Sequence, residues 1–201
     1  MEIEFEDKKI IFNRHLSMID LFVIDFVKIL EKHYKYVIIS GYVSILFGRN
    51  RATDDIDVFI EDAGFNNFLK FYTELMDDEW EFLNENSAKK LYEEYLSKKL
   101  AVRIAKKGTF SPNVEMKFPL TALNKEALED NLTVLLNNHK LIISTLEQQV
   151  AFKLYLGSNK DLQDAIHIYE IFKDRLDKQK LYNIANQLGV MNKLVEFLEN
   201  E

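Results

Sequence analysis

Two aspartates, Asp55 and Asp57, lie two positions apart directly before the apolar residues 58–60. Residues 54–60 are predicted to form a strand. Because the side chains of a strand alternate between its two faces, both carboxylates point the same way. Two carboxylates on one face can hold a divalent metal ion. The plainer alternative is that these aspartates only begin the strand.

An apolar run at residues 37–39 precedes Ser40 and Gly41, the small residues that a tight turn needs. Residues 36–39 are therefore predicted as a buried strand, and residues 42–47 as a short helix with Gly48 as its left-handed C-terminal residue. Together with the aspartate strand, this stretch forms a strand–helix–strand unit that carries the carboxylates on its second strand.

The remaining pattern predicts the elements that must position this unit. Helices are expected at residues 14–33, 64–76, 87–96 with Ser87 as N-cap, 124–130, 145–156, 160–173, 178–188 and 190–199. Strands are expected at residues 80–83, 100–105 and 114–118, with a strand or arm at 2–12 and a hairpin at 132–143 that turns at Asn137 and Asn138. The fold class is α/β (α+β), with an α/β domain at residues 1–143 and a helical region at 144–201 packed on it.

Composition limits the classes of protein to which this chain can belong. It has 201 residues, 47% of them hydrophobic, and no cysteine, so we expect a folded chain without disulfides or thiolate metal sites. No apolar stretch is long enough to span a bilayer and the first residues are acidic, so we expect a cytoplasmic protein with no membrane role. A net charge of −7 argues against a general nucleic-acid binder.

Charge is nevertheless uneven along the chain. Residues 87–117 carry eight lysines and arginines against three glutamates, a balance of about +5. Such a segment can face phosphates, and it can equally be a solvated helix face with ordinary ion pairs.

Two motifs together resemble a known superfamily. Gly41 and the segment 51–57, Arg-Ala-Thr-Asp-Asp-Ile-Asp, resemble the nucleotidyltransferases that share the DNA polymerase β-type palm, and more narrowly the R-x-T-x-D-I-D branch that includes AbiEii-type toxins. Residues 153–164 are similar to the K-L-x-A-G-R-x-K-D-x-x-D segment of that branch, from which Leu156 and Ser158 depart. Order and spacing fit over residues 36–170.

The resemblance implies a nucleotidyltransferase-type mixed sheet flanked by helices, and a reaction that depends on Mg²⁺ (or Mn²⁺) and uses an NTP. Asp55 and Asp57 would bridge the metal ions, which clamp the attacking and leaving oxygens. The superfamily usually adds a third carboxylate from a neighbouring strand. Glu115 is the candidate, as a metal ligand and as a general base. The alternative is that Glu115 pairs with Lys117 or Arg103.

The resemblance also implies residues that contact the nucleotide. Gly41 would admit the triphosphate at the helix start. Further expected contacts come from Ser40, Ser44, Arg51, Thr53 (which would hold the loop before Asp55), Lys153, Lys160 and Asp161 (which would orient a lysine). Tyr42 stands where the family commonly has a small residue, and we expect its ring to turn outward or to stack on a base.

Plainer alternatives remain open for several of these residues. Arg49 and Arg51 can be solvated loop residues, and Lys153 can extend its amine from a helix that faces the core. Asp161 can merely cap the helix that starts near it, with Asp164 in its first turn.

Three functions are compatible with these residues. The first is transfer of a nucleotidyl group to an RNA end (tRNA included) or to a protein hydroxyl, in a toxin-like protein with a cognate antitoxin. The second is a catalytically silent module of the same fold that binds a nucleotide or a partner. The third is RNA binding through residues 87–117.

Overall fold

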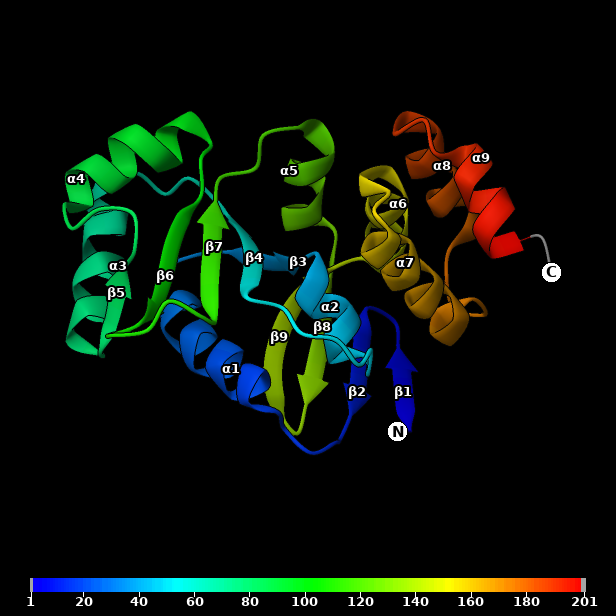
Figure 1. The fold of residues 1–201 in the computed structure, drawn as a ribbon, viewed down its shortest axis with the longest axis horizontal. Coiled ribbons are helices and arrows are strands. Elements are labelled where there is room, and N and C mark those ends of the chain that lie inside the picture. The colour runs from blue at the N-terminus through cyan, green and yellow to red at the C-terminus, as the bar shows by residue number, and fades with distance from the viewer. Residues whose placement is uncertain (1, 200–201) are drawn as a thin grey trace.

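The computed structural model describes residues 2–199 and is built on one mixed sheet of nine strands (Figure 1). The strands are β1 (Ile3–Glu6), β2 (Lys9–Phe12), β3 (Tyr36–Ile39), β4 (Asp55–Ile60), β5 (Trp80–Phe82), β6 (Val102–Lys106), β7 (Asn113–Lys117), β8 (Asn131–Leu136) and β9 (His139–Ser144). They lie in the order β1-β2-β8-β9-β3-β4-β7-β6-β5. The β2–β8, β9–β3 and β4–β7 pairs are parallel and the other pairs are antiparallel.

Helices cover this sheet, and the last helices of the chain lie beside one end of it (Figure 1). They are α1 (Met18–Leu30), α2 (Gly41–Leu46), α3 (Phe65–Asp77), α4 (Ala88–Lys90), α5 (Ala122–Glu129), α6 (Leu146–Leu156), α7 (Asn159–Phe172), α8 (Lys178–Gln187) and α9 (Met191–Leu194). The α/β class is confirmed. Among residues 2–199, none of the helices combines the length and the apolar character that crossing a membrane requires.

The strand–helix–strand unit and the hairpin form as their local patterns predict. Gly48 has φ +93° after α2, and Asn137 and Asn138 have φ +47° and +66° in the turn between β8 and β9. The arm expected at residues 2–12 is itself a hairpin, β1–β2, whose second strand pairs with β8.

The first long helix is shorter than expected, because residues 14–17 lie outside it. Ser17 is the N-cap of α1: its hydroxyl accepts a hydrogen bond from the backbone N–H of Asp20, and Asp20 accepts one from the backbone N–H of Ser17. This reciprocal capping box stops the helix from extending backwards.

The helix expected at residues 87–96 is also wrong in its form. Ser87 does cap α4, but a π-helical turn at residues 91–95 and a 3₁₀ turn at 96–98 follow it. Leu91 and Leu96 are both fully buried. Residues five apart point in different directions on an α-helix, so the wider π turn brings both leucines to the core. The helix expected at residues 190–199 likewise divides into α9 and a π-helical turn, Val195–Glu199.

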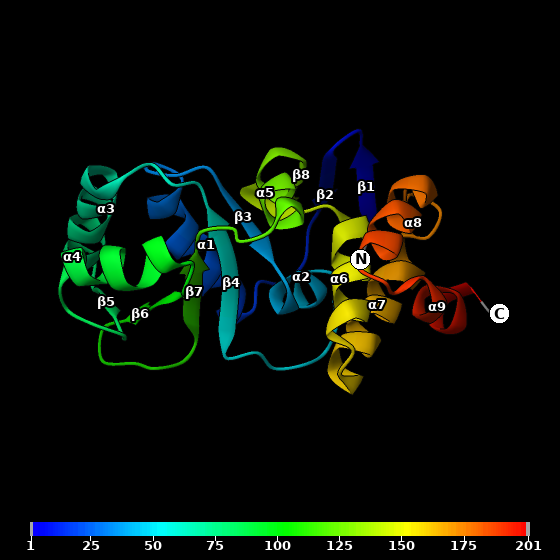
Figure 2. The same cartoon turned by 90° about the horizontal axis from the view of Figure 1, so that it is seen from above.

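The C-terminal helices lie beside α2 and the β1–β2 hairpin, as two perpendicular views agree (Figures 1 and 2). Phe172 of α7 makes the link: its ring centroid lies 4.7 Å from that of Phe47, which ends α2, and 6.1 Å from that of Phe5 in β1. The helices after β9 therefore pack against the element that carries Gly41.

Tyr42 lies in the core, and the expectation that its ring turns outward or stacks on a base is wrong. The side chain is fully buried, and its hydroxyl donates a 2.9 Å hydrogen bond to Oδ1 of Asp20, which is also fully buried. Burial raises the pKa of Asp20, but hydrogen bonds from Arg14, Ser17 and Tyr42 outweigh burial and lower it overall. Tyr42 thus ties α2 to α1.

Replacing Tyr42 with phenylalanine removes this bond and keeps the ring. We expect Tyr42→Phe to lower the free energy of unfolding by about 1.5 to 3 kcal/mol at neutral pH, the usual worth of a hydrogen bond to a charged group. The deficit should shrink as the pH falls through the lowered pKa of Asp20, because the carboxyl then loses its charge. Urea unfolding at neutral pH and at a pH below the lowered pKa of Asp20 measures the two free energies of unfolding. Tyr155→Phe, at an exposed tyrosine, is the matched control, and an equal loss in both variants would contradict the assignment.

Candidate active site

The three candidate carboxylates lie on two adjacent strands, β4 and β7. In the parallel pairing of these strands Asp57 lies opposite Glu115, and Asp55 lies opposite Asn113. Residues that face each other in a ladder point to the same side of the sheet. Asp55, Asp57 and Glu115 therefore share one face.

The two aspartates act on the ionisation of Glu115. Burial raises the pKa of Glu115, and the negative charges of Asp57 and Asp55 raise it further, against the opposing effects of Lys117 and Arg103. Such mutual repulsion favours a positive charge between the groups.

Two basic side chains supply that charge in the structure. Nζ of Lys117 lies 3.0 Å from Oδ1 of Asp57, and Nε of Arg103 lies 3.6 Å from Oε1 of Glu115. Of the two partners considered for Glu115, Arg103 is the one it has, and Lys117 instead pairs with the aspartate.

The chemistry of these donors suits Mg²⁺ that arrives with a substrate. Among residues 2–199, no three acidic, histidine or cysteine side chains form a ready-made metal cluster. Mg²⁺ usually takes one or two carboxylates and completes its shell with water and phosphate oxygens. Asp55 and Asp57 fit that requirement, and Glu115 lies next to them. The hydroxyl of Thr53 steadies Asp55, at 3.1 Å from its backbone oxygen and 3.2 Å from its Oδ1.

The entry to α2 is shaped by an arginine. Ser40 has a positive φ of 65°, which is rare for a residue with a side chain. A Cβ on Gly41 would come within 2.3 Å of Nη2 of Arg51. Gly41 therefore leaves the space in which the guanidinium of Arg51 lies. Ser44, in contrast, is buried inside α2 and does not line the cavity described below.

Arg51 belongs to a cluster of charges around Asp164, a fully buried residue of α7. Nε and Nη2 of Arg51 donate to the two oxygens of Asp164 at 3.0 and 2.9 Å. Nε of Arg49 lies 2.7 Å from Oδ1, and Nζ of Lys153 lies 3.0 Å from Oδ2. One carboxylate thus holds three cations from the loop before β4 and from α6. The plainer alternative put Asp164 in the first turn of its helix, but it lies beyond that turn, at the centre of this cluster.

The other residues of the distal motif have different environments. Ser158, rather than Asp161, is the N-cap of α7. Asp161 accepts from Nζ of Lys153 at 2.7 Å, and although burial raises the pKa of Asp161, hydrogen bonds from Lys153 and Ser158 lower it overall. Lys153 is itself buried. Lys160 is exposed and does not line the cavity.

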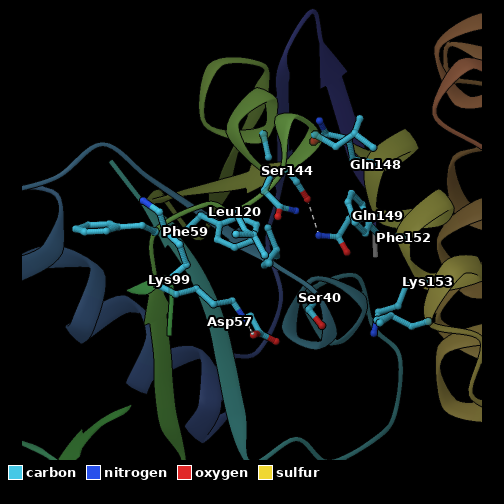
Figure 3. Close-up of a pocket in the computed structure, with 17 residues that line it drawn as sticks. Ser40, Asp57, Phe59, Lys99, Leu120, Ser144, Gln148, Gln149, Phe152 and Lys153 are labelled. Carbon is cyan, nitrogen blue, oxygen red and sulfur yellow. Dashed lines mark hydrogen bonds and ion pairs between the residues drawn. The ribbon is translucent and has the colours of Figure 1, made fainter. Parts of the chain in front are cut away.

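A cavity of about 480 Å³ opens beside the carboxylates (Figure 3). Asp57, Ser40 and Lys153 lie around one end of it. Its remaining walls come from β3, β4, β7, β9, α5, α6 and the segments next to them: Ile39, Phe59, Lys99, Lys117, Phe118, Leu120, Leu123, Asn124, Ala127, Ser144, Gln148, Gln149, Phe152 and Leu156. Its volume lies in the range of small-molecule sites.

The cavity has a polar wall, formed by Ser144, Gln148 and Gln149, that was not predicted from the sequence. Gln149 donates a 2.6 Å hydrogen bond to Ser144, and the amide of Gln148 is buried without a hydrogen-bond partner among residues 2–199. Consecutive glutamines on a helix that is buried on several sides are the signal that could have revealed it. Of the basic segment 87–117, only Lys99 and Lys117 line the cavity.

Comparison with known proteins places this geometry in a structural class. No protein-family model and no curated protein matches the chain. An antigenic nucleotidyltransferase-like protein from Paracoccidioides brasiliensis is similar in structure, with 19% identity over 90% of this chain and 91% of that one and a TM-score of 0.53. The antibiotic-resistance factor ANT(2'')-Ia is similar with 13% identity over 88% of this chain and 96% of that one, also at 0.53. The chain therefore has the nucleotidyltransferase-like fold.

Adding a methyl group at Gly41 tests whether the glycine serves Arg51. We expect Gly41→Ala to lower the free energy of unfolding by about 1 to 3 kcal/mol, the cost of overpacking. In an Arg51→Ala background the same change should be neutral or stabilising, because alanine favours a helix over glycine. Chemical unfolding of the four proteins of this double-mutant cycle measures the coupling. Equal effects in both backgrounds would show that the contact does not matter.

Removing Asp164 tests the charge cluster. Asp164→Ala leaves Arg49, Arg51 and Lys153 without their shared counter-charge, and we expect it to lower the free energy of unfolding by about 3 to 5 kcal/mol. Asp174→Ala, at an exposed aspartate further along the chain, should change it by less than about 0.5 kcal/mol. Denaturant titration compares them, and a similar small loss in both would contradict a structural role for Asp164.

Proposed function

We propose that this protein is a nucleotidyltransferase that uses Mg²⁺ (or Mn²⁺) and an NTP. The observation that carries the proposal is the register of β4 and β7, which sets Asp57, in the wall of a nucleotide-sized cavity, opposite Glu115 on the neighbouring strand. The cavity has three lysines in its wall and Asp57 as its single acidic residue among the described residues. That balance of charge suits a triphosphate bound together with a divalent cation.

In the proposed mechanism Asp55 and Asp57 hold the metal, with Glu115 beside them. Bound there, Mg²⁺ would stabilise the charge that develops on the attacking and leaving oxygens. Ser40 and Lys153 contact phosphate oxygens at the cavity end. Asp164 holds the guanidinium of Arg51 next to Gly41 and so fixes the position of the first residue of α2.

Glu115 is the proposed general base. It takes the proton of an incoming hydroxyl, whose oxygen forms a bond to the α-phosphorus while the bond to the β-phosphate breaks and pyrophosphate leaves. Its position opposite Asp57 in the ladder, next to the metal that the two aspartates would hold, suits this role. The apolar walls from Phe118, Leu123 and Phe152 can enclose the base of the nucleotide.

The acceptor is proposed from the motif resemblance. The likeness of residues 51–57 and 153–164 to AbiEii-type toxins favours an RNA end (tRNA included) or a protein hydroxyl, and a cognate antitoxin as partner. A catalytically silent module was suggested by a bulky Tyr42 near the phosphates and by Glu115, a glutamate where the family more often has an aspartate. Since Tyr42 is buried in the core, the first reason no longer applies.

Labelling experiments test the proposal. The protein is incubated with Mg²⁺, each of the α-labelled NTPs in turn, and either total RNA or cell extract. We expect the wild type to transfer label to an acceptor and the Asp55→Ala, Asp57→Ala double variant to fall to the level of the enzyme-free control. The double variant should keep the wild-type fold by circular dichroism, because removing clustered carboxylates relieves repulsion.

Asp54→Ala is the matched control, since it removes an exposed neighbouring carboxylate whose partner is Ser111. It should keep activity. Nucleotide binding by the wild type without any transfer would support the silent module instead. A double variant that labels as well as the wild type would refute the role of the two aspartates.

A further inference from the structure

Lys117 differs from the other lysines of the cavity in the partner that it has. Its amine pairs with Oδ1 of Asp57 at 3.0 Å, and both side chains are partly exposed, at 27% and 20%. Asp57 is a carboxylate proposed to bind metal. Lys117 therefore occupies one of the two oxygens through which Asp57 would bind the metal.

The other two cavity lysines are placed differently. Lys153 is held by Asp161 and Asp164, neither of which is a proposed metal ligand. Lys99 lies with its amine 5.0 Å from the centroid of the Phe118 ring, and within the described part of the chain it has no acidic partner. Arrival of a metal at Asp57 thus changes the partner of Lys117 and leaves the partners of the other two unchanged.

The strand geometry keeps Lys117 at the cavity after such a change. Glu115 and Lys117 are two apart on β7 and share a face, and Lys117 lies opposite Phe59, another residue of the cavity wall. The amine lies at the end of a flexible four-carbon stem, and a partly exposed ion pair is weak enough to be exchanged. A triphosphate bound with the metal would offer oxygens to the released ammonium group.

We propose that Lys117 is a nucleotide-binding residue that exchanges partners: it neutralises Asp57 in the metal-free protein and contacts the triphosphate once a divalent cation takes Asp57. This rests on the proposed function. Lys117 then acts against metal binding when no nucleotide is present and in favour of nucleotide binding when the metal is present. A residue with a purely structural role would not act with opposite signs on the two ligands.

Two binding measurements test the exchange on the full chain. The first is Mn²⁺ binding without nucleotide, followed by electron paramagnetic resonance. Lys117→Met should bind Mn²⁺ about two- to fivefold more tightly than the wild type, the range that corresponds to losing a partly exposed ion pair. Lys117→Arg, which keeps the charge, should bind it like the wild type. Lys99→Met, which removes a cavity lysine that has no acidic partner, should also leave this affinity unchanged.

The second measurement is calorimetric binding of the α,β-methylene analogues of the four NTPs with Mg²⁺ present. Lys117→Met should bind the preferred analogue on the order of tenfold more weakly, as expected for losing a charge-assisted bond to phosphate. Lys117→Gln serves as a second neutral variant in case the methionine protein folds poorly. Lys98→Met is the control, because Lys98 precedes Lys99 in the chain but does not line the cavity, and it should leave this affinity unchanged.

The outcomes separate this proposal from the proposed function. If the wild type transfers label but Lys117→Met changes neither affinity, or changes both in the same direction, the exchange is refuted and the enzyme remains. Tighter Mn²⁺ binding with unchanged nucleotide binding also refutes it, because Lys117 then only competes with the metal. If the wild type binds neither Mn²⁺ nor any analogue, both proposals fail.

Discussion

The arrangement of this molecule depends on the ion pairs made by the buried carboxylate of Asp164. This carboxylate pairs with Arg49 and Arg51 from the loop before β4 and with Lys153 from α6, and so it joins that loop to α6 and α7, about a hundred residues further along the chain. A buried charge is tolerated only when it is paired, so none of the three segments can take another position cheaply. Because Arg51 also fills the space left by Gly41, the cluster fixes the start of α2 relative to the candidate carboxylates.

Local patterns were enough to predict much of the fold. The strand before Ser40, the short helix that ends at Gly48 and the turn at Asn137 and Asn138 each depend on neighbours within a few residues. The order of strands does not, since β8 and β9 are inserted between β2 and β3 by contacts across more than a hundred residues. Periodicity also cannot separate an α-helix from a π turn over residues 91–95, where five-residue spacing of leucines decides the geometry.

The candidate site was predictable to a similar degree. Alternation along a strand places Asp55 and Asp57 on one face, and their likeness to a known motif brings in Glu115 from another strand, which the register of β4 and β7 puts beside Asp57. The choice of charge partners was not predictable. Lys117 pairs with Asp57 rather than Glu115, and three cations share Asp164, because such choices depend on distances that only the folded chain sets.

The interleaved sheet has a consequence for the order in which the chain can become complete. During synthesis the parallel β2–β8 ladder cannot form until residues 131–136 have left the ribosome, and the counter-charge of Arg49 and Arg51 follows only with residue 164. Until then Arg49 and Arg51 lack this counter-charge, and the cluster that positions Arg51 beside Gly41 is incomplete. Contacts of such long sequence separation form slowly. A nascent chain therefore carries β4 and β7, the strands with the candidate carboxylates, well before it can complete the cavity beside them.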